Sequence, residues 1–141
     1  MLDSRDEIVD RLRKRLNHGM RIIRVEDGLI FEHRNATHFL AEIDLQGGKI
    51  TVPVTADFRD HPDYTEDEIV EHAMEVLRPR LRLYRDRGFR IRETDWQPGY
   101  RSATYDGTKI PVFIAFVEKD LDGREQLYAE LAWLLEQLPD R

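Results

Sequence analysis

One stretch decides the fold of this chain: residues 65–88, which read TEDEIVEHAMEVLRPRLRLYRDRG. Thr65 and Glu68 stand three positions apart at its start, which is the spacing of a capping box, in which each side chain bonds the other residue's backbone N–H. Pro79 lies inside the stretch and Gly88 closes it. We therefore predict a long helix from Thr65 that has a kink or a break at Pro79 and stops at Gly88.

Apolar residues recur through this stretch every three or four positions, the period of a helix with one buried face. They are Ile69, Val70, Ala73, Val76, Leu77, Leu81 and Tyr84.

Two further segments carry the same kind of helix-start signature. Residues 4–7 read SRDE and residues 122–125 read DGRE, so a short oxygen-bearing side chain again precedes a glutamate by three positions. Apolar residues at helical spacing follow both. We predict a first helix over about 3–17 and a closing helix that ends at Pro139.

Short alternating segments between these helices predict strands. Before the long helix they cover residues 21–26, 29–33, 38–45 and 49–55, and after it residues 89–96 and 110–118. Asp27-Gly28 is typical of a two-residue hairpin turn. Pro53 donates no backbone hydrogen bond, so we expect the strand that contains it to lie at a sheet edge or to end early. Residues 97–109 form a long loop between the last two strands.

The predicted order is thus helix, three or four strands, helix, two strands, helix. Consecutive antiparallel strands interrupted by helices indicate the α+β class, here with one twisted antiparallel sheet of five or six strands. The chain has 141 residues and no internal repeat or linker-like segment. We therefore expect one α+β domain over residues 1–141.

Composition excludes several classes of protein. The chain has no cysteine, which excludes disulfide scaffolds and thiol chemistry. Its net charge of −6 opposes binding to nucleic acid, because phosphate contacts need positive charge. No apolar run reaches the length of a membrane span, and the N-terminus is acidic and amphipathic. We expect a cytoplasmic protein that binds neither nucleic acid nor membrane.

No nucleophile, phosphate-binding or dinucleotide-binding motif occurs, so we assign no catalytic residue and no cofactor. Two groups keep a metal-dependent enzyme open as the alternative. His33 and His38 flank a predicted turn, and Glu68, His72 and Glu75 share one face of the long helix. A zinc site needs three or four converging ligands. Because neither group supplies such a set, we interpret these residues as solvent-exposed side chains and assign no metal ligand.

Arginines recur from the end of the long helix into the following strand: Arg78, Arg80, Arg82, Arg85, Arg87, Arg90 and Arg92. Bases near a helix C-terminus complement the helix dipole. We expect most of these residues to pair with the 28 acidic residues of the chain. A phosphate-binding surface is the remaining interpretation of this run.

The predicted loop and its flanks carry the best candidates for a partner-binding surface. Aromatic and cationic side chains on a loop above a rigid sheet often contact partners. We assign this role to Trp96, Tyr100, Arg101 and Tyr105, together with the strand residues Arg90 and Arg92.

The order of elements from Ser4 to Leu138 resembles the type III secretion chaperone-like fold. Members of that family back a twisted antiparallel sheet with helices and usually pair as homodimers. The resemblance implies a non-enzymatic, chaperone-like or other protein-binding module that forms a homodimer and binds another protein. The extra strand and the 97–109 loop depart from the family pattern.

Overall fold

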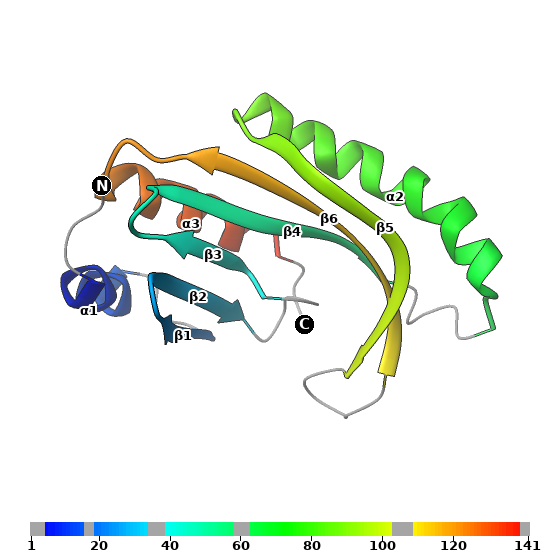
Figure 1. The fold of residues 1–141 in the computed structure, drawn as a ribbon, viewed down its shortest axis with the longest axis horizontal. Helices are drawn as coiled ribbons and strands as arrows, with labels where there is room; N and C mark the ends of the chain where they lie inside the picture. The colour runs from blue at the N-terminus through cyan, green and yellow to red at the C-terminus, as the bar shows by residue number, and fades with distance from the viewer. Residues whose placement is uncertain (1–4, 16–18, 34–38, 58–62, 103–108, 139–141) are drawn as a thin grey trace. The chain divides into compact units, whose positions relative to one another are not determined.

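The computed structural model describes residues 5–15, 19–33, 39–57, 63–102 and 109–138. Three helices and six strands follow one another along these residues (Figure 1). In chain order they are α1 (Arg5–Arg15), β1 (Met20–Val25), β2 (Gly28–His33), β3 (Ala41–Asp44), β4 (Lys49–Asp57), α2 (Glu66–Asp86), β5 (Arg90–Ser102), β6 (Lys109–Asp120) and α3 (Arg124–Glu136). The predicted α+β class is confirmed, with four strands before the long helix.

The six strands form one open antiparallel sheet in the order β1-β2-β3-β4-β6-β5. The outer strands are therefore β1 and β5, and the prediction that Pro53 marks an edge or an early end is wrong. Its strand, β4, lies between β3 and β6 and continues to Asp57. The described pairing with β3 covers only Lys49 to Thr51, so Pro53 removes no hydrogen bond from that pairing.

The chain divides into two compact units, and each is described by itself. Unit 1 comprises residues 1–52 and 119–141 and contains α1, β1, β2, β3 and α3. Buried side chains come from α1, β2, β3 and α3, among them Ile8, Leu12, Leu29, Phe31, Ile43, Leu127, Leu131 and Leu134, whereas the residues of β1 are half-buried or exposed. Lys119 and Glu130 form a 2.6 Å ion pair in which the glutamate side chain is 2% exposed. On its surface, α1 and α3 exchange the ion pairs Arg11–Glu125 and Arg124–Glu7.

Leu40 of unit 1 departs from the alternation of its strand. The two-residue period of residues 38–45 puts Leu40 on the same face as Glu42 and Asp44, which are exposed, yet Leu40 is buried. The strand begins only at Ala41, and the Leu40 N–H donates to the Phe31 carbonyl at 2.7 Å. Because Leu40 lies outside the regular ladder, the two-residue period does not govern its direction.

Unit 2 comprises residues 53–118 and contains the end of β4, α2, β5 and most of β6. Its buried apolar residues are Val54, Ala56, Ile69, Ala73, Leu77, Leu81, Phe89, Ala115 and Val117. Within the described residues no helix is long and apolar enough to cross a membrane.

The start of α2 is the predicted capping box. The Glu68 N–H donates to the Thr65 hydroxyl at 3.3 Å, and the Thr65 N–H donates to the Glu68 carboxylate at 3.2 Å. Two amides that the helix itself leaves unbonded thereby gain partners. The cap explains why the helix begins at this point.

The end of α2 is equally well defined. Gly88 has a φ of 98°, a conformation that side chains disfavour. It lets the N–H groups of Gly88 and Phe89 donate to the carbonyls of Arg85 and Tyr84, each at 3.0 Å. The rings of Tyr84 and Phe89 meet edge to face at 5.4 Å. These bonds form a Schellman motif with its apolar contact, and the predicted stop at Gly88 is confirmed.

The interior of α2 bears on two predictions. The helix is continuous through Pro79, so the predicted break is absent (Figure 1). Val76, assigned to the buried stripe, is 39% exposed. The stripe that faces the core is narrower than the sequence pattern, because Ile69, Ala73, Leu77 and Leu81 already fill it.

The prediction of a capping box at residues 122–125 is wrong. Gly123, not Asp122, is the N-cap of α3, and no side chain bonds the first helical amides. The Asp122 N–H instead donates to the Gln126 side chain at 2.6 Å. Since the helix begins one residue later than the signature implies, the Asp122 carboxylate is out of register with those amides. The cap expected at Ser4 lies outside the described residues.

The first hairpin turn is displaced by one residue from the prediction. Val25 pairs with Gly28, so Glu26 and Asp27 make the turn and Gly28 opens β2. Positive φ values occur among the described residues only at Gly19, Gly48 and Gly88. A Cβ atom on Gly28 would overlap the carbonyl oxygen of Ile43 on β3. Gly28 is thus needed for the close approach of two strands, not for a left-handed turn.

We expect Gly28→Ala to destabilise the protein by about 1–3 kcal/mol, because backbone must move to admit the methyl group. Urea unfolding measures this change. Gly123→Ala is the control, since a Cβ there meets nothing within 4 Å, and its cost should stay below about 1 kcal/mol. Equal effects of the two substitutions would contradict the steric explanation.

We expect Thr65→Ala to lower the free energy of unfolding by about 1 kcal/mol, because it removes the hydroxyl that accepts the Glu68 amide. Asp122→Ala should change it by less than about 0.5 kcal/mol, since no side chain caps α3. Thermal or urea unfolding of both variants compares the two caps directly. A larger loss at Asp122 would show that its carboxylate does cap the helix.

Candidate functional site

The segment assigned to partner binding is a strand over most of its length. Residues 97–102, predicted to be loop, continue β5, and only residues 103–108 separate it from β6 and lie outside the description. The pairing of β5 with β6 shifts register between Ile91 and Thr94 and again between Asp95 and Gly99. Such irregularities accommodate Pro98 and Gly99, the residues that made the segment resemble a loop.

The candidate partner-binding residues consequently share one strand. Arg90, Arg92, Trp96, Tyr100 and Arg101 all belong to β5. The sixth candidate, Tyr105, lies outside the described residues. Figure 1 shows that β5 runs beside β6. The helix α2 belongs to the same unit as β5. The role of these residues in binding stays a prediction.

The first three residues of β5 present alternating cationic and apolar side chains. Arg90 Nε lies 3.1 Å from Glu118 Oε1 on β6. The Arg92 guanidinium lies 5.0 Å from the ring centre of Phe116, a cation–π contact. Ile91 stands opposite Val117 in the register and is 40% exposed. One face of the strand therefore carries the two cations and the other carries an exposed apolar side chain.

Most arginines of α2 form no ion pair with the described residues. Arg80 donates to the Thr55 carbonyl at 2.8 Å. Arg78, Arg82 and Arg85 are exposed and make no hydrogen bond or ion pair with the described residues. The expectation of pairing with acidic residues is met at Arg90, and among the described residues it is not met at these three.

Exposed apolar residues accompany these cations, and the sequence interpretation missed them. On α2, Leu83 is 52% exposed and Val76 is 39% exposed, and on β5 Ile91 is 40% exposed. Leu83 follows Leu81 by two positions and precedes Tyr84 by one, so it falls off the stripe of period three or four. That spacing is the signal by which its exposure was predictable.

The proposed Glu68, His72 and Glu75 group does not form a metal site. Glu68 is used in the capping box, where its carboxylate accepts from Thr65. His72 Nδ1 lies 3.7 Å from Glu75 Oε2, and the His72 ring stacks on Tyr64 at 5.4 Å. His33 lies on β2, and His38 is outside the described residues. Within the described part of the chain no three His, Cys, Asp or Glu side chains are placed to hold a metal.

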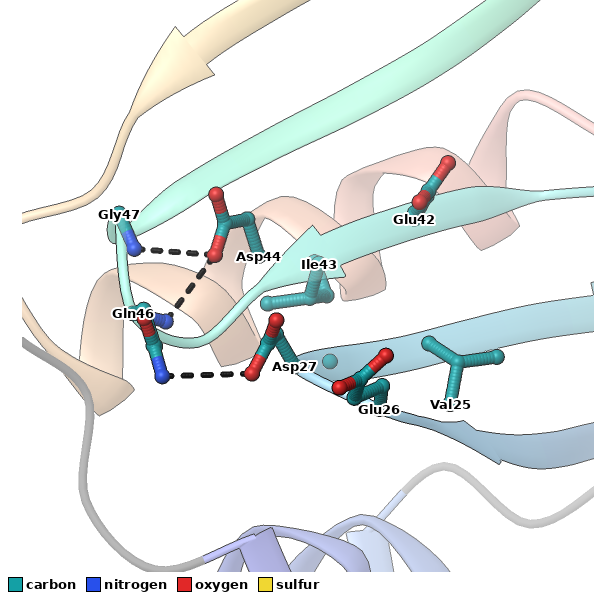
Figure 2. A pocket seen from close by; sticks show the side chains of 9 residues that line it. Val25, Glu26, Asp27, Glu42, Ile43, Asp44, Gln46 and Gly47 are labelled. Atoms are coloured by element: carbon teal, nitrogen blue, oxygen red, sulfur yellow. Dashed lines mark hydrogen bonds between the residues drawn. The ribbon is translucent and has the colours of Figure 1, made fainter.

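Unit 1 contains a hollow of about 680 Å³ beside the turns that follow β1 and β3. Four carboxylates line it: Glu26, Asp27, Glu42 and Asp44. Figure 2 shows that they do not point to a common centre. The Asp44 carboxylate accepts from the amides of Gln46 and Gly47, at 3.0 and 2.9 Å, and Asp27 accepts from the Gln46 side chain at 3.2 Å (Figure 2). Two of the four carboxylates therefore stabilise the turn, and the hollow is a feature of the fold.

No protein-family model, curated protein or solved structure matches this chain. The geometry of unit 2 is thus the basis for any functional proposal.

The pKa of Tyr84 provides a test of how the end of α2 packs. Burial raises the pKa of the Tyr84 hydroxyl from 10.0 to about 12, and the charge of Arg80 opposes part of the rise. In the unfolded chain Tyr84 ionises near pH 10, whereas in the folded chain it keeps its proton until about pH 12. Its contribution to stability is therefore complete below pH 10 and is lost as the pH rises to about 12.

We expect the free energy of unfolding to fall through this window and to fall less in Tyr84→Phe. Urea unfolding on both sides of the window measures the difference. Tyr64→Phe is the control, because it removes a tyrosine and leaves Tyr84 in place. Identical pH dependence in the wild type and Tyr84→Phe would contradict the burial of this hydroxyl.

Proposed function

We propose that this protein is a non-enzymatic, cytoplasmic module that forms a homodimer and binds an extended, acidic segment of another protein along β5. One observation carries the binding proposal. β5 is an outer strand of the sheet, and it begins with the exposed sequence Arg90-Ile91-Arg92. This combination suits a partner that adds a strand.

Strand addition supplies both affinity and selectivity. The outer side of β5 pairs with no other strand of the described chain, so its backbone groups can bond a partner in extended conformation. Alternate side chains of the partner then meet opposite faces of the sheet. Acidic side chains would meet Arg90 and Arg92, and apolar side chains would meet Ile91.

The charge of the surface favours an acidic partner in particular. The chain as a whole carries −6, so cations gathered on one strand are a local feature. Arg92 makes no ion pair with the described residues, so its charge is available to a carboxylate. The element order shared with the chaperone-like fold supports the same class of function.

The metal-dependent alternative has weaker support. Its best candidate ligand on α2, Glu68, is held in the capping box by two bonds to Thr65. A non-enzymatic binding role accounts for the exposed features of unit 2 without assigning chemistry to these side chains.

We expect a fluorescein-labelled peptide of alternating glutamate and valine to bind the protein, with an affinity that falls as salt is added. Arg92→Glu should weaken binding about tenfold, or about 1.4 kcal/mol, because it places a carboxylate opposite the peptide's own. Fluorescence anisotropy measures both effects.

Arg21→Glu is the matched control, since Arg21 is an exposed arginine on β1, the other outer strand. It makes the same change in net charge and should leave the affinity unchanged. Equal loss in both variants, or equal binding of a lysine–valine peptide, would overturn the proposed site on β5.

A further inference from the structure

The solvent-facing side of α2 is divided into an acidic half and a basic half. Five exposed charges follow one another at intervals of four and three residues, which places them along one side of the helix. They are Glu71, Glu75, Arg78, Arg82 and Arg85. The two acids precede the three bases, so this row, which we call the α2 charge row, changes sign once along its length.

The helix dipole does not account for the α2 charge row. Its effect falls off within the first and last turns, whereas Glu71, Glu75, Arg78 and Arg82 lie inside the 21-residue helix. Glu71 and Glu75 stand four residues apart, as do Arg78 and Arg82, and like charges at this spacing destabilise a helix. Asp86 follows Arg82 by four residues, yet no ion pair joins them. Within a single copy these two like-charged pairs are therefore unfavourable, and only Glu75 and Arg78, three residues apart, attract each other.

An exposed apolar seam runs next to the α2 charge row. Val76, Pro79 and Leu83 are separated by three and four residues, the spacing of positions that face a partner helix. Val76 and Leu83 are 39% and 52% exposed. Each seam residue directly follows a residue of the charge row, so the seam lies about 100° around the helix from the row.

We propose that the second copy of this chain docks on α2, with the two α2 helices antiparallel about a two-fold axis between Glu75 and Arg78. This inference rests on the proposed homodimer and identifies its contact surface. The axis lays Glu71 of each copy beside Arg82 of the other and Glu75 beside Arg78, with the apolar seam at the edge of the contact. A two-fold contact requires one surface that is complementary to itself, and a row that changes sign at the axis meets this requirement.

The charge pattern favours a second copy over a different partner. A uniformly acidic partner would match the arginines but would be repelled by Glu71 and Glu75. At 1.5 Å per residue, Glu71 lies about 10 Å from Arg78 along the helix and Arg85 lies about 15 Å from Glu75, and both separations are beyond the roughly 8 Å screening length at physiological salt. The outer charges of the row therefore need an opposite charge close to them. Since one helix face per copy is a small contact, we expect a micromolar and salt-sensitive dimer.

Two charge-reversed variants test the docking surface. Arg78→Glu with Arg82→Glu and Arg85→Glu makes the row wholly acidic, and Glu71→Lys with Glu75→Lys makes it wholly basic. By sedimentation equilibrium each variant alone should have a mass near 16.7 kDa, whereas the wild type approaches twice that value. An equimolar mixture of the two variants should regain the dimer, because each row then meets its opposite. Misfolding of either variant cannot produce this recovery.

Arg13→Glu with Lys14→Glu is the matched control, because it reverses two exposed cations of α1 and should leave the dimer intact. If the wild type is dimeric and both reversed variants are dimeric too, α2 is not the contact and another surface joins the copies. If the mixture stays monomeric, the antiparallel arrangement is wrong. A wild type that is monomeric at all micromolar concentrations overturns the homodimer itself, while the peptide assay on β5 tests partner binding separately.

Discussion

The hydrogen bond from the Phe89 N–H to the Tyr84 carbonyl closes α2 and directs the chain into β5. It forms only because Gly88 adopts a φ of 98°. The helix thus ends at Asp86 and the strand begins at Arg90. Every candidate surface of unit 2 depends on this short connection. It sets which arginines lie on the helix, which lie on the strand, and which face of the strand Arg90 and Arg92 occupy.

The two units use their charges differently. In unit 1 Arg11 of α1 and Arg124 of α3 are joined to acidic residues of the same unit, Glu125 and Glu7, and Lys119 is joined to buried Glu130. In unit 2 Arg78, Arg82 and Arg85 are exposed and form no such pairs with the described residues. Surface ion pairs add little stability, so this contrast concerns recognition more than folding. It is why both proposals concern unit 2.

Local signals predicted the helices well and the long strand poorly. The capping box at Thr65 and the stop at Gly88 are correct because each depends on bonds within a few residues. Residues 97–102 were predicted as loop, and Pro98 and Gly99 within them disfavour a regular strand. Pairing with residues 109–112 of β6 overrides that local preference. Of the candidate residues on β5, Tyr100 and Arg101 were therefore placed on the wrong kind of element.

By itself the sequence determined the class of fold, the limits of α2 and the order of charges along it, because short-range bonds and helical periodicity encode all three. Only the tertiary structure decided which of those charged side chains pair with an opposite charge. Whether an arginine meets a carboxylate depends on residues distant in the chain, as Arg90 does with Glu118 and Arg82 does not. Likewise Val76 and Leu83 became surface residues because the core of unit 2 was already filled from the other side of the helix.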